Sequence, residues 1–151
     1  MMRQYSGIGT APTKAPYQKS QAILELERLA NEQARRDHPE MDPRFLAPRT
    51  FRDDDANSLT GCIVKYITLQ GGFASRVNNQ GTYNQRLKKY IPSTSRKGLA
   101  DVLATYHGDS LMVEVKYGAD KLSEHQKKIR YEQEKSGGYY YVARNFSEFK
   151  F

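Results

Sequence analysis

Two stretches in the first half of the chain repeat apolar residues at the spacing of an amphipathic helix. The first predicts a helix over about residues 20–37, with Ser20 as its N-cap. The second predicts a helix that begins after Asp55 or Asn57 and ends at Gly71-Gly72. The apolar positions are Ile23, Leu26, Leu29 or Ala30, and Ala34 in the first helix, and Leu59, Cys62, Ile63, Tyr66 and Ile67 in the second.

Further along the chain the pattern changes to short apolar runs that predict β-strands. These runs span 73–78, 100–106, 111–117 and 139–143, with a polar loop from 79 to 97. A tight turn around Gly108-Asp109 joins the second and third strands. A helix from Ser123 to Gly137-Gly138 separates the last two strands, which predicts that they lie parallel. The prediction is therefore an α/β (α+β) fold of order α-β-β-β-α-β, with a mixed central sheet flanked by helices.

The N-terminal third differs in composition from the rest of the chain. Residues 1 to about 18 are rich in proline, glycine and small polar residues, a composition that does not bury enough apolar surface to fold. Three prolines lie between residues 39 and 52, which predicts a linker. We expect a flexible N-terminal arm over residues 1–50 that carries one amphipathic helix, followed by a domain over residues 51–151.

Charged residues interrupt two of the predicted strands. Because side chains alternate along a strand, Glu114 and Lys116 share one face. If residues 108–109 are the central turn residues, Asp101 opposes Lys116 and joins that face, on a diagonal of about 7–8 Å from Glu114. A three-residue loop would instead turn Asp101 to the opposite face.

Two carboxylates that converge in an apolar sheet repel each other and require a cation. Lys116 alone satisfies this need if the three charges form a cross-strand salt bridge. The alternative is Mg²⁺ or Mn²⁺, which binds one or two carboxylates and keeps positions for water and a phosphate oxygen. Such an ion activates water and polarises phosphate, which is the chemistry of phosphodiester hydrolysis.

The spacing of these residues resembles a known family. Glu114-Val115-Lys116 follows Asp101 by thirteen positions in an α-β-β-β-α-β chain, a pattern similar to the PD-(D/E)XK nuclease superfamily. "KGLADVLATYHGDSLMVEVKYGADKLSEHQKK" and the later "GGYYYVA" resemble the VRR-NUC branch, in which a Gly precedes the metal-binding Asp and Leu-Ser-x-x-Gln opens the next helix. The resemblance covers roughly residues 57–149 and excludes the N-terminal arm.

The resemblance implies a metal-dependent DNA endonuclease that uses Mg²⁺ or Mn²⁺, acts on branched or junction DNA, and forms a homodimer. It implies that Asp101, Glu114 and the backbone carbonyl of Val115 are metal ligands. It also implies that Lys116 is the catalytic lysine and that Gln126 reaches the site from the second helix of the domain.

Two points of this assignment stay open in the sequence. Ser123-x-x-Gln126 is also a capping box, in which Gln126 only satisfies the backbone of Ser123. The family usually carries a Glu on its first helix, whereas residues 56–72 contain no carboxylate. Asn57 and Asp55 are the two candidates for that position.

A basic segment leads from the first helix of the domain to Asp101. Residues 71–100 contain no acid but include Arg76, Arg86, Lys88, Lys89, Arg96 and Lys97. A solvated loop is one explanation. Because Tyr83 and Tyr90 interleave with the cations, we favour contact with a nucleic-acid backbone, with rings available for stacking on unpaired bases. Nothing in the segment is typical of a base-reading element.

The overall composition narrows the function classes further. The 151 residues carry a net charge of +7, which points to a polyanionic partner. The single Cys62 excludes an internal disulfide and a multi-cysteine zinc site, and we expect a cytoplasmic protein and Cys62 in the core. No apolar run approaches the roughly 18 residues of a membrane span. We expect His107 and His125 to face solvent rather than to act in catalysis.

Three functional hypotheses follow. The first is the nuclease. The second is a catalytically impaired nucleic-acid-binding module of the same fold, suggested by the absent first-helix acid. The third is an interaction protein that docks a partner through the helix around Ile23 to Ala34. No residue distinguishes a DNA substrate from an RNA substrate.

Overall fold

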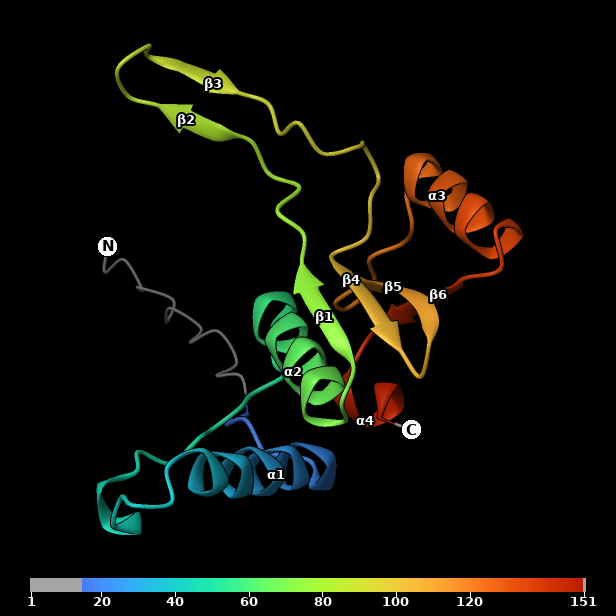
Figure 1. The fold of residues 1–151 in the computed structure, drawn as a ribbon. Helices are drawn as coiled ribbons and strands as arrows, with labels where there is room; N and C mark the ends of the chain where they lie inside the picture. The colour runs from blue at the N-terminus through green and yellow to red at the C-terminus, as the bar shows by residue number, and fades with distance from the viewer. Residues whose placement is uncertain (1–14, 151) are drawn as a thin grey trace, which may run out of the picture.

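The computed structural model describes residues 15–150, in which helices cover both faces of a central sheet (Figure 1). The expected flexibility of residues 1–14 lies outside the described part. In chain order the elements are α1 (Gln21–Asp37), the 3-10 turn η1 (Pro43–Phe45), α2 (Ala56–Leu69), β1 (Phe73–Arg76), β2 (Thr82–Asn84), β3 (Lys89–Ile91), β4 (Val102–Tyr106), β5 (Asp109–Val115), α3 (Glu124–Lys135), β6 (Tyr139–Ala143) and α4 (Phe146–Phe149).

The central sheet has four strands in the order β1-β4-β5-β6. β1, β4 and β5 pair antiparallel, whereas β5 and β6 pair parallel across the intervening α3. The helices also begin where the capping residues predict, because Ser20, Asp55 and Ser123 each accept a backbone N–H of the first turn. The predicted mixed α/β sheet flanked by helices is confirmed.

The turn between β4 and β5 differs from the prediction by one residue. His107 (φ 51°) and Gly108 (φ 88°) are its central residues, since Tyr106 pairs with Asp109. A two-residue turn with positive φ at both positions matches the twist of a hairpin, and Gly is favoured at the second position. The register therefore slides by two residues, so that Asp101 comes opposite Glu114 and not Lys116. Sliding by two preserves the face of every side chain.

The segment predicted as a polar loop contains a second hairpin. β2 and β3 pair antiparallel with Tyr83 opposite Tyr90. This hairpin projects away from the central sheet (Figure 1). Each strand has only three residues, which is too short for a periodic pattern to stand out in the sequence.

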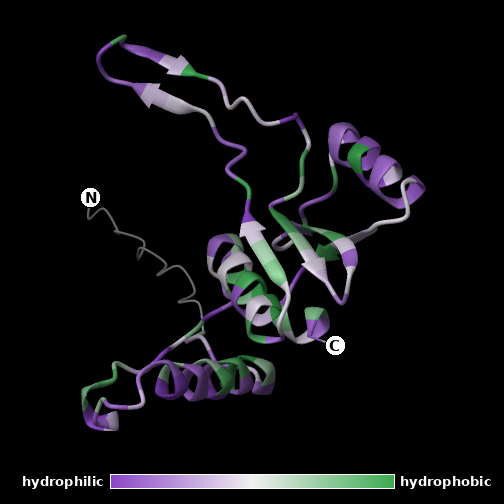
Figure 2. Cartoon of the chain, in the orientation of Figure 1, coloured by the Kyte–Doolittle hydropathy of each residue, from purple (hydrophilic) through white to green (hydrophobic). Residues whose placement is uncertain are grey.

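Each face of the central sheet packs on a different set of helices. The main core lies between the sheet and α1, α2 and α4; its largest fully buried side chains include Phe146, Phe149, Ile23, Leu26, Leu59, Ile63, Ile67, Val102 and Val113. The opposite face packs on α3 through Ile129, Tyr140 and Ala100. α3 is otherwise strongly hydrophilic (Figure 2). Within residues 15–150, no helix is both long and apolar enough to cross a membrane.

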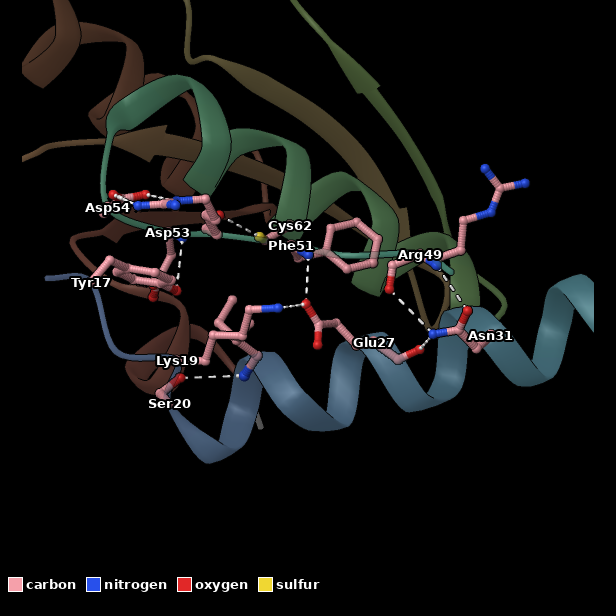
Figure 3. Close-up of polar contacts among 12 residues, drawn as sticks. Tyr17, Lys19, Ser20, Glu27, Asn31, Arg49, Phe51, Asp53, Asp54 and Cys62 are labelled. Atoms are coloured by element: carbon pink, nitrogen blue, oxygen red, sulfur yellow. Dashed lines mark hydrogen bonds and ion pairs between the residues drawn. The ribbon is translucent and has the colours of Figure 1, made fainter. Parts of the chain in front are cut away.

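The segment between α1 and α2 lies along α1 and is tied to it by polar contacts (Figure 3). Glu27 Oε1 accepts the N–H of Phe51 at 2.8 Å, and the Asn31 side chain exchanges hydrogen bonds with the backbone of Arg49. Because Ile23 of α1 is fully buried, α1 contributes to the same core as α2 and α4. The domain boundary near residue 51 stays a prediction.

Asp53 connects the two ends of the described chain. Its Oδ1 accepts the Tyr17 hydroxyl at 2.8 Å (Figure 3), and its Oδ2 accepts the N–H of Phe146 at 3.1 Å. Burial, followed by the hydrogen bond to Asp53, raises the pKa of Tyr17 to about 12. One carboxylate therefore holds both the segment before α1 and the start of α4.

Candidate active site

Asp101 lies directly before β4 and is held from two sides. Its Oδ2 accepts the N–H of Val115 at 2.8 Å, and its backbone carbonyl accepts the N–H of Val77 at 2.8 Å. The first contact joins Asp101 to β5, and the second joins it to the segment that follows β1. The carboxylate is thereby fixed beside β5, close enough to Glu114 for its charge to raise the pKa of that residue.

Glu114 is the charged residue most deeply buried at this face, with only 3% of its surface exposed. Its Oε1 accepts two contacts, from Lys116 Nζ at 3.1 Å and from Gln126 Nε2 at 2.5 Å. Within the described chain its Oε2 is buried and has no partner in hydrogen-bonding geometry. One oxygen of this carboxylate is therefore anchored, and the other is buried without a hydrogen bond of good geometry in this part of the chain, although the Tyr140 hydroxyl lowers the pKa of this carboxylate.

Gln126 fulfils both roles that the sequence left open. Its Oε1 accepts the N–H of Ser123 at 2.8 Å, while Ser123 Oγ accepts the N–H of Gln126 at 3.3 Å, which completes the capping box. Its Nε2 meanwhile donates to Glu114. The two roles coexist because the amide has an acceptor end and a donor end.

Burial controls the electrostatics of this site. Desolvation, followed by repulsion from Asp101, raises the pKa of Glu114 from 4.5 to about 7, although the Lys116 ammonium opposes the shift. Burial, and next the charge of Glu114, also raises the pKa of Tyr140 well above its usual range. The hydroxyl of Tyr140 thus interacts electrostatically with Glu114, but in the described chain it too lacks a partner in hydrogen-bonding geometry. The sequence analysis did not single out Tyr140, whose only signal is its position in a short apolar strand.

A cavity of about 550 Å³ opens beside Asp101. It is lined by Asn57, Arg76, Val77, Asn78, Asn79, Gln80 and Asp101. Of the two candidates for the first-helix position, Asn57 lines this cavity. Asp55 instead caps α2, where it accepts the N–H and the hydroxyl of Ser58 at 2.8 and 2.7 Å. The amides of residues 78–80 were not predicted as part of the site.

The donor set fits a hard divalent cation. Within residues 15–150 there is no group of three or more His, Cys, Asp or Glu side chains that could hold a metal ion. Two carboxylates with an amide or carbonyl oxygen nevertheless match the preference of Mg²⁺, which takes one or two carboxylates and retains water. The buried, unpartnered Oε2 of Glu114 is the atom that such a cation would compensate. The role of the Val115 carbonyl as a ligand stays a prediction.

The predicted nucleic-acid-binding residues occupy three places. Arg76 lines the cavity beside Asp101. Arg86, Lys88 and Lys89 are exposed on the β2–β3 hairpin. Lys97 is exposed close to Gly98, whereas Arg96 forms an ion pair with Glu132 of α3 at 2.6 Å. Of these predicted residues, the structure therefore places Arg76 alone on the cavity beside Asp101.

Three further residues have the surroundings that the sequence predicted. His107 and His125 are exposed, and Cys62 is buried in the main core. Burial raises the pKa of the Cys62 thiol to about 12, which keeps it protonated and unreactive.

Gly98 sets the distance between the Asp101 segment and α3. It has a φ of +83°, and an added Cβ would lie 2.6 Å from the backbone carbon of His125, the neighbour of Gln126. We expect Gly98→Ala to lower the free energy of unfolding by about 1–3 kcal/mol, because it adds both backbone strain and a clash. Urea denaturation measures this change.

Gly108→Ala is the matched control for Gly98. Gly108 has a similar φ of +88°, but an added Cβ would meet no atom within 4 Å. Gly98→Ala should therefore destabilise the protein more than Gly108→Ala. Equal losses of stability would mean that the contact between Gly98 and α3 has no energetic weight.

Comparison with known proteins gives a likeness in fold. No protein-family model matches the chain, and no curated protein matches it. A solved VRR_NUC domain is structurally similar, with 19% sequence identity and a TM-score of 0.47, over 62% of this chain and 87% of that domain. The chain is thus similar in fold to the nuclease-family domain that its sequence resembles.

Proposed function

We propose that this chain is a divalent-metal-dependent DNA endonuclease that hydrolyses phosphodiester bonds. The main support is the group formed by Asp101, Glu114 and Lys116, in which Glu114 Oε2 is buried and makes no hydrogen bond of good geometry within residues 15–150, although the Tyr140 hydroxyl interacts with this carboxylate. A buried acceptor in this state is costly unless a cation binds it.

A structural salt bridge between Lys116 and Glu114 explains less of the geometry. Burying an ion pair costs desolvation energy that often equals or exceeds the attraction between the charges. Lys116 and Gln126 both contact Oε1 of Glu114, so the salt bridge does not extend to Oε2, which makes no hydrogen bond of good geometry with the described residues. An ion pair that served stability alone would not explain why Oε2 is buried at a cost in desolvation energy.

We assign Mg²⁺ or Mn²⁺ to Asp101, Glu114 and the carbonyl of Val115, and the Asn57 side chain lines the same cavity as Asp101. When bound, the ion lowers the pKa of water and polarises the phosphate. Gln126 and Lys116 fix the orientation of the Glu114 carboxylate through Oε1. The Lys116 ammonium, 14% exposed, also stabilises negative charge that develops on the phosphate.

The proposed substrate is branched or junction DNA, cut by a homodimer. The net charge of +7 and the acid-free segment 71–100 support a polyanionic partner. Arg76, on the wall of the cavity, supplies a cation next to the proposed cleavage site. The preference for branched DNA and the dimer rest on the resemblance to VRR-NUC domains.

The test uses labelled duplex, flap and four-way-junction DNA with Mg²⁺, Mn²⁺ or EDTA. We expect the wild type to cleave at least one branched substrate only when metal is present. Asp101→Asn should lower the rate by about 100-fold or more, because it weakens the binding of the ion. Asp109→Asn, an exposed carboxylate at the start of the same strand pair, is the matched control. Equal rates for the two variants, or no wild-type product with either metal, would exclude the nuclease.

The second candidate is a catalytically impaired nucleic-acid-binding module. Asn57 favours it, because an amide is a weaker cation ligand than the acid of the family's first helix. This candidate requires DNA binding that weakens as salt rises, without any metal-dependent product. The cleavage assay with labelled DNA distinguishes this candidate from the nuclease.

A further inference from the structure

The β2–β3 hairpin and its connections form a projecting hairpin segment, residues 77–97, whose base adjoins the candidate active site (Figure 1). Ser93 Oγ and Ser95 Oγ both donate to the carbonyl of Asn78 at 3.2 Å, which ties the outgoing and returning chains together. The Val77 N–H bonds to the carbonyl of Asp101 at 2.8 Å. The base of the segment is therefore fixed relative to the carboxylates.

Two aromatic rings lie exposed on this segment. Tyr83 and Tyr90 are cross-strand partners and are 58% and 59% exposed. An added Cβ at Gly81 would lie 2.5 Å from a ring carbon of Tyr90, so this ring packs closely over bare backbone. These large exposed rings do not pack into a hydrophobic core, so they are candidates for contact with a ligand.

Two adjoining cavities lead from Tyr83 to Asp101. A cavity of about 680 Å³ at the hairpin is lined by Asn78, Gln80, Gly81, Thr82, Tyr83, Asn84, Gln85, Ile91, Pro92, Ser93, Thr94 and Ser95. It shares Asn78 and Gln80 with the 550 Å³ cavity beside Asp101. The two cavities therefore adjoin, and amides and hydroxyls line the junction.

The charges along the path suit a polyanion. Arg76 lies at the end next to Asp101, while Arg86, Lys88 and Lys89 lie near the tip of the hairpin. Asp101 is the one acid that lines either cavity. A phosphate backbone would meet cations at both ends and neutral hydrogen-bonding groups between them.

We propose that the hairpin segment binds an unpaired DNA strand, whose bases stack on Tyr83 and Tyr90 while its backbone passes Asn78 and Gln80 towards Asp101. The proposal rests on the proposed nuclease function and names the part of the substrate that this segment holds. An unpaired strand fits better than a duplex, because stacking on a side chain requires a base whose face is free.

Fluorescence anisotropy with labelled single-stranded and duplex DNA of the same sequence tests this proposal. The full chain is used at fixed salt with EDTA, so that binding is measured without hydrolysis. We expect Tyr83→Ala with Tyr90→Ala to weaken single-strand binding by about tenfold or more, and duplex binding by less than twofold. The matched control is Tyr131→Ala with Tyr139→Ala, two exposed tyrosines outside the hairpin segment.

A second variant separates stacking from hairpin stability. Tyr83→Leu with Tyr90→Leu keeps an apolar cross-strand pair but removes the flat rings, so it should lose single-strand affinity as the alanine variant does. Wild-type affinity in the leucine variant, or equal losses on single strand and duplex, would overturn the proposal. The binding assay contains EDTA, so its result does not depend on a metal ion. If binding depends on the tyrosines but the cleavage assay gives no product, the nuclease is excluded and this inference stands.

Discussion

Lys116→Met should abolish most metal-dependent cleavage while DNA binding stays within about twofold of the wild type. The ammonium of Lys116 lies 3.1 Å from Glu114 Oε1 and is mostly buried, so methionine removes the charge but fills much of the same volume. Loss of a cation that stabilises charge in the transition state costs roughly 100- to 1000-fold in rate. Initial cleavage rates and anisotropy at matched salt measure the two effects.

Lys121→Met controls for the general loss of a positive charge, since Lys121 is exposed in the loop after β5. It should change the cleavage rate by no more than about twofold. A Lys116→Met protein that cleaves at the wild-type rate would reduce Lys116 to a structural partner of Glu114.

Glu114→Gln should stabilise the metal-free protein at neutral and alkaline pH. The folded state raises the pKa of Glu114 from 4.5 to about 7, so between these values it binds a proton more tightly than the unfolded state does. The free energy of unfolding of the wild type therefore falls as pH rises from 4.5 to 7, by about 3 kcal/mol. Glutamine has the same shape, carries no charge and keeps an acceptor for Gln126, so it avoids this loss.

Urea denaturation in EDTA at pH 4.5 and pH 8 measures the difference. We expect the wild type and Glu114→Gln to be similar at pH 4.5 and the variant to be more stable by about 3 kcal/mol at pH 8. Glu124→Gln, an exposed carboxylate on α3, should show no such gain. Adding Mg²⁺ should then stabilise the wild type and not Glu114→Gln. The same stability difference at both pH values would contradict the burial of a charged Glu114.

Much of the sheet was predictable because local rules and packing agree. The caps at Ser20, Asp55 and Ser123 define where the helices begin, and a helix between two strands predicts their parallel pairing. The turn was misplaced by one residue, which moves the register by two residues and so keeps the parity on which the predicted face of Asp101 depends. The prediction that these charged side chains share a face thus depended on whether the turn has an even or odd number of residues, and not on where the turn lies.

Other features depend on long-range contacts that a pattern does not encode. Tyr140 reaches the site because β6 pairs with β5 so that Tyr140 lies beside Met112, a register set only in the folded sheet. Asn57 and Asp55 were both candidates for the first-helix position at the site. The structure was needed to show that Asp55 is the N-cap of α2 and that Asn57 lines the cavity. The β2–β3 hairpin has strands too short for alternation to be significant.

The bond between the Val77 N–H and the Asp101 carbonyl has a consequence for the products of cleavage. Under the proposed function, this bond restrains the base of the hairpin relative to the carboxylate, so the number of nucleotides between the bases held at Tyr83 and the cut bond would be set by protein geometry. Fragments released from substrates of different sequence should therefore end at one constant offset from the start of the unpaired region.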